Sequence, residues 1–274
     1  MKILKLFSDI DKPEKHNYEI NYGLWNIITP YSAKISKFDI EVLNDYDFVF
    51  LPGMGLVPEI NKRWKDHMNL FNEIKKHNIK KILFANDICY GLYDHEFFDG
   101  IDFVFYRDLD KNRNIPKNKN YWLPWSIDTK KYTAKYGGKK ISFNCSVSSA
   151  YPLRQKISKI IKNSHYKGKK YIKHLQECGA GIHTDSELQP TTRAKVLEFA
   201  ACGTQIISNK TNKMNYYFPD ELIIYFNDIE ELRYIIKNFK ANIEIQKKLR
   251  QIVITKHDHK TRAKEVIEKI KTLQ

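Results

Sequence analysis

The most informative segment of the sequence is Thr191-Thr192-Arg193-Ala194-Lys195-Val196-Leu197-Glu198-Phe199-Ala200-Ala201-Cys202-Gly203-Thr204-Gln205-Ile206-Ile207-Ser208. It predicts a short helix that the polar Thr pair opens and Gly203 ends, followed by a buried strand. One acid, Glu198, stands among small and apolar residues. A lone acid on a helix is most often a surface residue; the other interpretation is a side chain that binds the hydroxyl groups of a ligand.

Apolar runs of strand length alternate with helical patterns on both sides of this stretch. Strands are predicted at 3–7, 46–51, 80–85 and 101–105, and again at 140–145, 180–183, 205–208 and 222–225. Helices are predicted at 62–77, 153–161, 171–178, 229–239, 243–254 and 261–273. Continuous apolar strands that alternate with helices indicate parallel sheets covered on both faces. The fold class is therefore α/β, with two Rossmann-like halves.

The two halves meet near a pair of tryptophans. Trp122 and Trp125 flank Pro124, and a polar segment with Gly137 and Gly138 follows before the next strand begins. Polar, glycine-containing segments are typical of domain boundaries. We therefore expect a first domain over 1–125 and a second over 126–256, with a last helix over 257–274.

The chain is basic, with 47 Lys and Arg against 32 Asp and Glu and a formal charge of +15. This excess favours an anionic partner, which can be nucleic acid, an acidic membrane surface or a phosphorylated substrate. Richness in Lys, Ile, Asn and Tyr is also expected of an AT-rich coding sequence, so compositional drift is the alternative. We expect a protein of a reducing cytoplasm, because its four cysteines lie far apart and no secretory leader is seen before them. We expect no transmembrane segment, because no apolar run approaches the roughly 18 residues that a membrane span needs. No Cys or His pair has the spacing of zinc ligands.

Ligands of open parallel sheets bind beyond the carboxyl ends of the strands. In the second half, the loop with Ser146 and Ser148, followed by Arg154, offers hydroxyls and a cation that suit a diphosphate; an ordinary polar loop is the alternative. The helix start at 191–195 offers two further cations, which a solvated basic face would also explain. Because Arg193 and Lys195 are two residues apart, only one of them is expected to touch the ligand.

The first half offers its own strand-end residues. Asn86 and Asp87 follow a predicted strand, where Asp87 could position or deprotonate an acceptor hydroxyl, although capping of the next helix explains an Asp equally well. Gly53 and Gly55 could admit a substrate close to the backbone or simply form a tight turn. Near the end of the chain, His257-Asp258-His259 is expected to cap and connect helices, and the aromatic run 216–218 to pack in the core rather than stack on a base.

An ordered set of these motifs resembles the nucleotide-sugar-binding domain of two-domain (GT-B) glycosyltransferases of the glycosyltransferase 4 and spore-protein-like type. The matching segments are 121–128, 142–146 with Arg154, 195–203, 227–232 and 261–263. The resemblance implies two Rossmann-like domains facing across a cleft, with the last helix returning to the first domain. It covers the chain well from about Trp122 onward and weakly before it.

The resemblance also implies roles for single residues. Glu198 would bind the donor ribose, and Lys195 and Arg154 the diphosphate. Nearby phosphate or sugar oxygens would be met by Ser146, Ser148 and Thr192. Thr191 and Arg193 are further donor-binding candidates because of their place at the predicted helix start, and do not follow from the resemblance. The family's hexose-binding acid stands eight positions before the ribose Glu, where this chain has Pro190, and Glu187 is the candidate replacement. No Asp-x-Asp metal motif is present at a strand end, so we expect neither a metal nor a cofactor.

A second resemblance is local. Leu197-Glu198-Phe199-Ala200-Ala201-Cys202-Gly203-Thr204 and the acid at Asp87 are similar to segments of the DNA alpha-glucosyltransferases of T-even phages. The two resemblances together imply a retaining transfer of a hexose, glucose in the first instance, from a UDP-sugar to an acceptor hydroxyl. Hydroxymethylated pyrimidines of double-stranded phage DNA are the first candidate acceptor. A cell-surface or spore saccharide is the alternative, as is a non-catalytic protein that binds nucleotides or nucleic acid.

Overall fold

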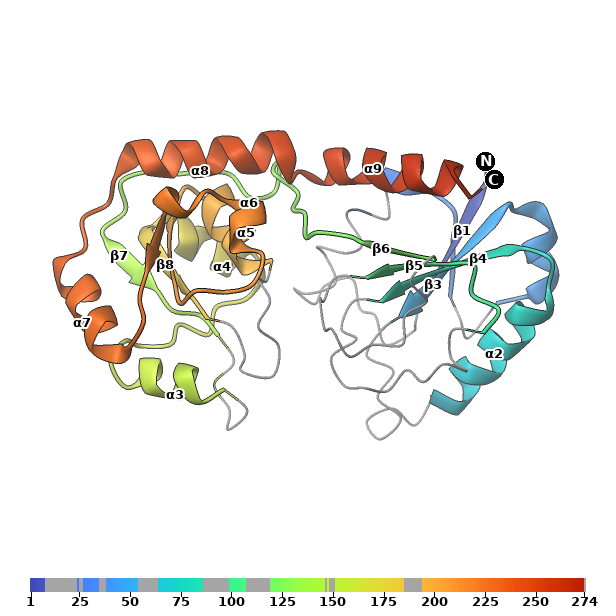
Figure 1. Ribbon diagram of the computed structural model, residues 1–274, viewed down its shortest axis with the longest axis horizontal. Helices are drawn as coiled ribbons and strands as arrows, with labels where there is room; N and C mark the ends of the chain where they lie inside the picture. The colour runs from blue at the N-terminus through green and yellow to red at the C-terminus, as the bar shows by residue number, and fades with distance from the viewer. Residues whose placement is uncertain are drawn as a thin grey trace. The chain divides into compact units, whose positions relative to one another are not determined.

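The computed structural model describes residues 1–7, 24, 27–34, 38–53, 64–85, 99–106, 119–145, 147, 151–184 and 194–273 (Figure 1). Two compact units divide between Pro124 and Trp125. Unit 1 takes the described residues up to Pro124 except Leu24, and unit 2 takes Leu24 and the described residues from Trp125 onward. Each unit is built on its own sheet.

Unit 1 contains a six-stranded sheet in which every neighbouring pair is parallel. Its order is β2 (Ser32–Lys34), β1 (Ile3–Phe7), β3 (Phe48–Gly53), β4 (Lys80–Ala85), β5 (Phe103–Tyr106) and β6 (Asn120–Trp122). The helical elements described here are η2 (Ile40–Asp45) and α2 (Trp64–Lys76). The core is made of aliphatic side chains, among them Leu4, Leu6, Val49, Leu51, Ile74, Leu83 and Val104. The four strands predicted in this half are present, the second of them at 48–53 and not at 46–51, so that Gly53 ends a strand and does not stand in the predicted turn. Strands β2 and β6 were not predicted.

Unit 2 contains a four-stranded parallel sheet in the order β10 (Ile223–Tyr225), β9 (Gln205–Ser208), β8 (Cys178–His183) and β7 (Lys140–Ser142). Its helices are α3 (Pro152–Ser158), α4 (Gly168–Gln176), α5 (Lys195–Ala201), α6 (Met214–Tyr217), η4 (Asp220–Leu222), α7 (Ile229–Asn238), α8 (Ile243–Lys256) and α9 (His259–Lys271). Ile206 and Ile207 are both fully buried but belong to different clusters. Because successive side chains of a strand point to opposite faces, both faces of this sheet are covered, as predicted.

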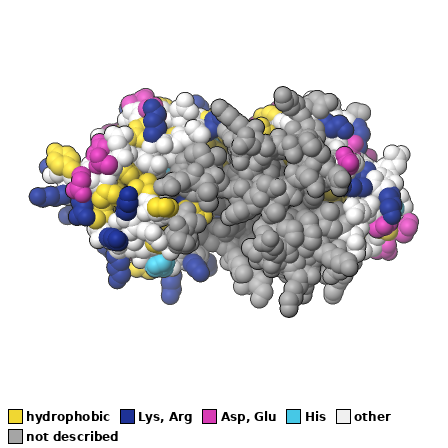
Figure 2. Space-filling view, turned by 60° about the horizontal axis from the view of Figure 1, so that its bottom comes forward, with side chains coloured by type: hydrophobic (Ala, Val, Ile, Leu, Met, Phe, Trp, Pro, Cys, Tyr) yellow, Lys and Arg dark blue, Asp and Glu magenta, His cyan; other side chains and the backbone are white. Residues whose placement is uncertain are grey.

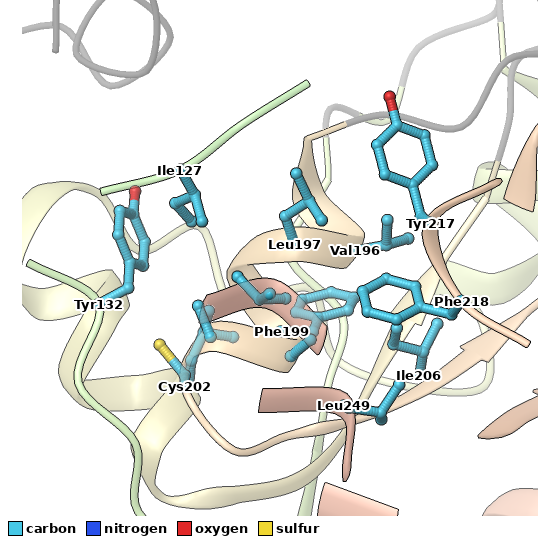
Figure 3. Packing of buried hydrophobic residues seen from close by; sticks show 14 of the residues in the cluster. Ile127, Tyr132, Val196, Leu197, Phe199, Cys202, Ile206, Tyr217, Phe218 and Leu249 are labelled. Carbon is cyan, nitrogen blue, oxygen red and sulfur yellow. The ribbon is translucent and has the colours of Figure 1, made fainter. Parts of the chain in front are cut away.

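Helix α5 lies at the centre of the larger cluster. Figure 3 shows Val196, Leu197 and Phe199 among side chains from the rest of the unit, such as Leu249 of α8 and Phe218. The ring of Phe199 fills the space above Gly181 of β8, where an added Cβ would lie 2.7 Å from ring carbons. All residues of α5 after Lys195 are buried, which explains why the sequence there is small and apolar.

The predicted end of α5 is confirmed, and its predicted start differs. Gly203 has φ +77°, and the N–H groups of Gly203 and Thr204 donate to the carbonyls of Ala200 and Phe199. This pattern is the glycine-containing Schellman ending of a helix. At the other end α5 begins at Lys195, and Ala194 makes no capping bond because its side chain has no oxygen. A Thr pair therefore does not open the described helix.

The segment 257–259 separates α8 from α9. The Asp258 side chain accepts a bond from the Lys260 N–H as the N-cap of α9, and the Thr129 hydroxyl donates to Asp258 at 2.5 Å. The Ser126 hydroxyl lies 2.8 Å from Nδ1 of His259. The predicted capping and connecting role of this segment is confirmed, while the docking of α9 on the first domain stays a prediction.

On the face of unit 2 seen in Figure 2, Lys and Arg side chains lie along the lower edge and also at the left and top, while the acidic side chains of this unit lie at the upper left. In the part of the chain that the structure describes, no helix is long and apolar enough to cross a bilayer.

Candidate active site

Two of the predicted site residues, Lys195 and Glu198, both lie against the side chain of Tyr171. The hydroxyl of Tyr171, on α4, donates to Oε2 of Glu198 at 2.9 Å. The ammonium group of Lys195 lies 5.1 Å from the centroid of the same ring. Lys195 and Glu198 are three residues apart on α5, so they share one face of the helix.

Burial gives this group its electrostatic character. Glu198 is 4% exposed and Tyr171 is fully buried. Burial and the neighbouring carboxylate of Glu198 raise the pKa of Tyr171 well above its ordinary value of 10, so the phenol remains a neutral donor. Glu198 is therefore not the solvated surface acid that its sequence position could have meant. It is a buried carboxylate oriented by a hydrogen bond.

Lys195 also contacts the end of β7. Its ammonium group donates to the backbone carbonyl of Asn144 at 2.7 Å, two residues beyond the last residue of the strand. An ammonium group has three donors, and one carbonyl uses one of them. The cation thus stands at the carboxyl end of a parallel strand, where anionic ligands of such sheets bind.

Arg154, on α3, lies at the end of the next strand. Its Nε donates to the hydroxyl of Thr184 at 2.9 Å, and its Nη2 donates to the Thr184 carbonyl at 3.1 Å. The guanidinium carbon also lies 4.1 Å from the ring centroid of Tyr151. Thr184 directly follows β8 and is 1% exposed. A second cation is thereby fixed at the same edge of the sheet as Lys195.

Two more polar side chains close the ends of β8 and β9. Nδ1 of His183 lies 3.0 Å from the hydroxyl of Ser208, and both residues are buried. The carboxyl edge of the sheet in unit 2 therefore presents hydroxyl, imidazole, guanidinium, ammonium and carboxylate groups. Such a set can neutralise phosphates and accept hydrogen bonds from a diol.

The remaining predicted residues fall outside the described part of the chain, apart from one glycine. Gly53 is the last residue of β3 in unit 1. Those outside the described residues are Asn86, Asp87, Gly55, Ser146, Ser148, Glu187, Thr191, Thr192 and Arg193. Their proposed roles stay predictions.

Sequence reasoning missed the partners that hold the charged groups. Tyr171 is 27 residues from Glu198 in the chain, Asn144 is 51 from Lys195, and Thr184 is 30 from Arg154. No spacing rule connects residues so far apart. Tyr171 could have been noticed only as an aromatic residue between lysines on the predicted helix 171–178.

Solved structures share this architecture. The HepE protein of Anabaena, in complex with UDP and glucose, has a TM-score of 0.68 at 11% identity, with 99% of this chain and 100% of that chain covered. Sucrose-phosphate synthase of Thermosynechococcus elongatus has a TM-score of 0.66 at 10% identity, with 100% and 99% covered. The DNA-modifying enzyme beta-glucosyltransferase has a TM-score of 0.59 at 12% identity, with 99% of each chain covered. At these identities the likeness shows the fold, and it confirms the prediction of the two-domain GT-B glycosyltransferase fold.

The sequence itself gives the family. No curated protein matches the chain. A family model described as glycosyl transferase-like matches residues 126–268, which include both cations and the buried acid described above. The prediction of a glycosyltransferase is confirmed at this level, while the finer assignment to the glycosyltransferase 4 and spore-protein-like type stays a prediction. With more than half of its length matched by that model, the chain belongs to the glycosyl transferase-like family.

Proposed function

We propose that unit 2 binds the UDP portion of a UDP-sugar at the carboxyl edge of its sheet. The observation that carries the proposal is the grouping of Lys195 and Glu198 around Tyr171, with the ammonium group on the carbonyl that follows β7. In this proposal Lys195 and Arg154 neutralise the diphosphate, and Glu198 accepts hydrogen bonds from the ribose hydroxyls. The Anabaena HepE structures with UDP support the choice of nucleotide, since they share the fold.

The reaction we propose is transfer of a hexose, glucose in the first instance, to an acceptor hydroxyl with retention of configuration. The bond between the anomeric carbon and the diphosphate oxygen breaks, and a bond from that carbon to the acceptor oxygen forms. Negative charge then grows on the departing UDP, where two fixed cations stabilise it without reorganisation. We propose that this charge stabilisation requires no metal, and that Asp87 orients the acceptor hydroxyl and takes up its proton.

For the acceptor we propose hydroxymethylated pyrimidines in double-stranded DNA. The formal charge of +15 favours a polyanionic substrate. A solved DNA-modifying beta-glucosyltransferase with the same fold supports the idea that this architecture can serve DNA. The alternatives are a cell-surface or spore saccharide, or a binding protein without turnover, for which Pro190 at the position of the family's hexose-binding acid is the supporting feature. We propose a cytoplasmic location, as DNA modification requires.

Donor binding is tested with matched variants. Glu198→Gln and Lys195→Gln are compared with Glu230→Gln and Lys237→Gln, which remove the same charges from exposed positions on α7. Calorimetry with UDP should show weaker binding for the first pair only. Removal of one preorganised charge-stabilising group should lower kcat for UDP release by about 10²–10³ in Lys195→Gln. EDTA should leave the wild-type rate unchanged. If the wild type releases no UDP from any common UDP-sugar, with or without acceptor, the transferase proposal fails.

The acceptor and the stereochemistry need a separate experiment. Labelled UDP-glucose is incubated with hydroxymethylcytosine DNA, hydroxymethyluracil DNA or unmodified DNA, and the product linkage is read by NMR. Label in one of the hydroxymethylated duplexes with an α linkage is the expected result. Label in no DNA would end the DNA proposal, and a β linkage from this α-linked donor would refute retention.

A further inference from the structure

Almost the whole net charge of the chain comes from one segment of unit 2. Between Asp128 and Glu177, residues 129–176 contain 13 Lys and Arg and no Asp or Glu. The other 226 residues hold 34 Lys and Arg against 32 Asp and Glu, which is close to balance. Compositional drift would spread its lysines over the chain, so it does not explain a charge concentrated in 48 residues.

The lysines of α3, α4 and the loop between them all face solvent. Seven of them are exposed: Lys156, Lys159, Lys162, Lys167, Lys169, Lys170 and Lys173. We call these seven side chains the basic surface. None of them makes an ion pair with another described residue, whereas nearby Lys140 pairs with Glu177 at 3.1 Å. Seven exposed like charges held close together repel one another, and a bound polyanion would lower that cost.

The fold holds the basic surface in one orientation. Tyr171 and Leu175 are the buried residues of α4, so its lysines at 169, 170 and 173 lie on the exposed side. The loop before α4 is fixed to the end of β7: Asn163 exchanges two hydrogen bonds with the backbone of Cys145, at 3.2 and 2.6 Å. The surface is therefore built on ordered backbone.

The basic surface adjoins the candidate active site. The side-chain amide of Asn144 donates to the carbonyl of Tyr166, in the loop before α4, at 3.0 Å. The backbone carbonyl of the same Asn144 accepts the bond from Lys195. One residue thus links the basic loop to the cation proposed to bind the donor diphosphate.

The chemistry of the surface decides its partner. In the described residues from 151 to 176, Tyr166 is the one exposed large hydrophobic side chain, and its ring lies against His174 at 4.6 Å between centroids. Insertion into a bilayer needs exposed apolar side chains, and single-stranded nucleic acids need open aromatic rings on which bases stack. A surface of lysines that has neither exposed apolar side chains nor open aromatic rings is suited to contact the regularly spaced phosphates of a duplex.

We propose that the basic surface of unit 2 binds the phosphate backbone of double-stranded DNA, independently of sequence, and holds the duplex beside the donor site. The inference rests on the proposed function in taking DNA as the acceptor. Its binding step needs neither base modification nor transfer, so the two can fail separately.

The test measures binding of unmodified duplex DNA by fluorescence anisotropy at several salt concentrations. The triple variant K167Q/K169Q/K170Q is compared with K237Q/K240Q/K248Q, which removes the same three charges from exposed positions at the end of α7, after it and on α8. For each lysine that contacts a phosphate, the slope of log K against log salt concentration should fall by about 0.9. The first variant should therefore lose up to about 2.7 in slope, and the second should keep the wild-type slope.

Controls separate this inference from the donor site. The first triple variant should bind UDP as the wild type does, because none of its three lysines lies at Lys195 or Glu198. Equal loss of DNA binding in both triple variants would overturn the inference, as would loss of UDP binding in the first. Wild-type binding to vesicles with a high content of phosphatidylserine but not to duplex DNA would also overturn it. Duplex binding that is lost only in the first variant supports it, even if no sugar is transferred.

Discussion

Replacing Tyr171 by Phe removes one oxygen atom and leaves the ring that packs beneath Lys195. The hydroxyl is fully buried and donates at 2.9 Å to a carboxylate that is 4% exposed. A hydrogen bond to a charged buried group contributes about 1.5–3 kcal/mol. We therefore expect the free energy of unfolding of Tyr171→Phe to fall by about 2 kcal/mol. This corresponds to a melting temperature lower by about 4–8 °C for a unit of this size.

The assay is equilibrium unfolding in urea, together with calorimetry of UDP binding. Tyr166→Phe is the matched control, since that tyrosine is exposed. If Tyr171 orients Glu198 toward the ribose, UDP should also bind about tenfold more weakly to Tyr171→Phe, which corresponds to about 1.4 kcal/mol. The double variant with Glu198→Leu removes both partners, so it should lose less stability than the two single changes added together. A Tyr171→Phe protein within about 0.5 kcal/mol of the wild type would refute the argument.

Three further predictions concern the free energy of unfolding, measured in urea. Gly203→Ala should lower it by about 2 kcal/mol or more, because φ is +77° and the added Cβ would lie 2.8 Å from a backbone oxygen. Gly168→Ala, with φ +55° and nothing within 4 Å of the added Cβ, should lower it by only about 1 kcal/mol, and equal losses in the two variants would contradict the crowding argument. Burial, with a neighbouring Arg, lowers the pKa of His257 to about 4, so the unfolded chain binds the proton first and the free energy of unfolding should fall by about 3 kcal/mol as the pH drops from about 6.5 to about 4. His257→Gln should lack this pH-dependent loss, and the same pH dependence of stability in the variant and the wild type would count against the prediction. Arg250→Met should lower the free energy of unfolding by about 2–4 kcal/mol, because the guanidinium donates to three backbone carbonyls, including that of Ala201 at the end of α5. The stability of Arg250→Lys should lie between those of Arg250→Met and the wild type, and a wild-type melting temperature for Arg250→Met would show that these bonds are dispensable.

Much of the fold was readable from local pattern. The strands at 80–85 and 205–208 match the structure residue for residue, because each contains an uninterrupted apolar run, 82–85 and 206–207, between polar residues. Gly203 as the helix end was equally readable, since few other residues adopt positive φ there. The strand Ser32–Lys34 could not be predicted, because its identity as a strand depends on pairing with β1.

For the candidate site, the sequence indicated the charged groups but not their surroundings. Lys195 and Glu198 could be chosen because they lie at and just after a predicted helix start and match the motif of the resembling family. Whether Glu198 is solvated or buried could not be decided from the sequence, since the same local sequence is compatible with either environment. The acid-free run 129–176 is visible in the sequence, but the common exposure of the seven lysines of the basic surface and their lack of ion pairs with other described residues are not.

The α/β class, the alternation of strands and helices, and the residue types at the strand ends could be read along the chain, because they follow from period, propensity and turn chemistry. The contacts by which Tyr171 orients Glu198, Asn144 holds Lys195 and Arg154 reaches Thr184 arise only when the chain is folded. Those contacts join residues 27 to 51 positions apart. Contacts of that range are set by how elements pack on the sheet, and local pattern carries no information about them.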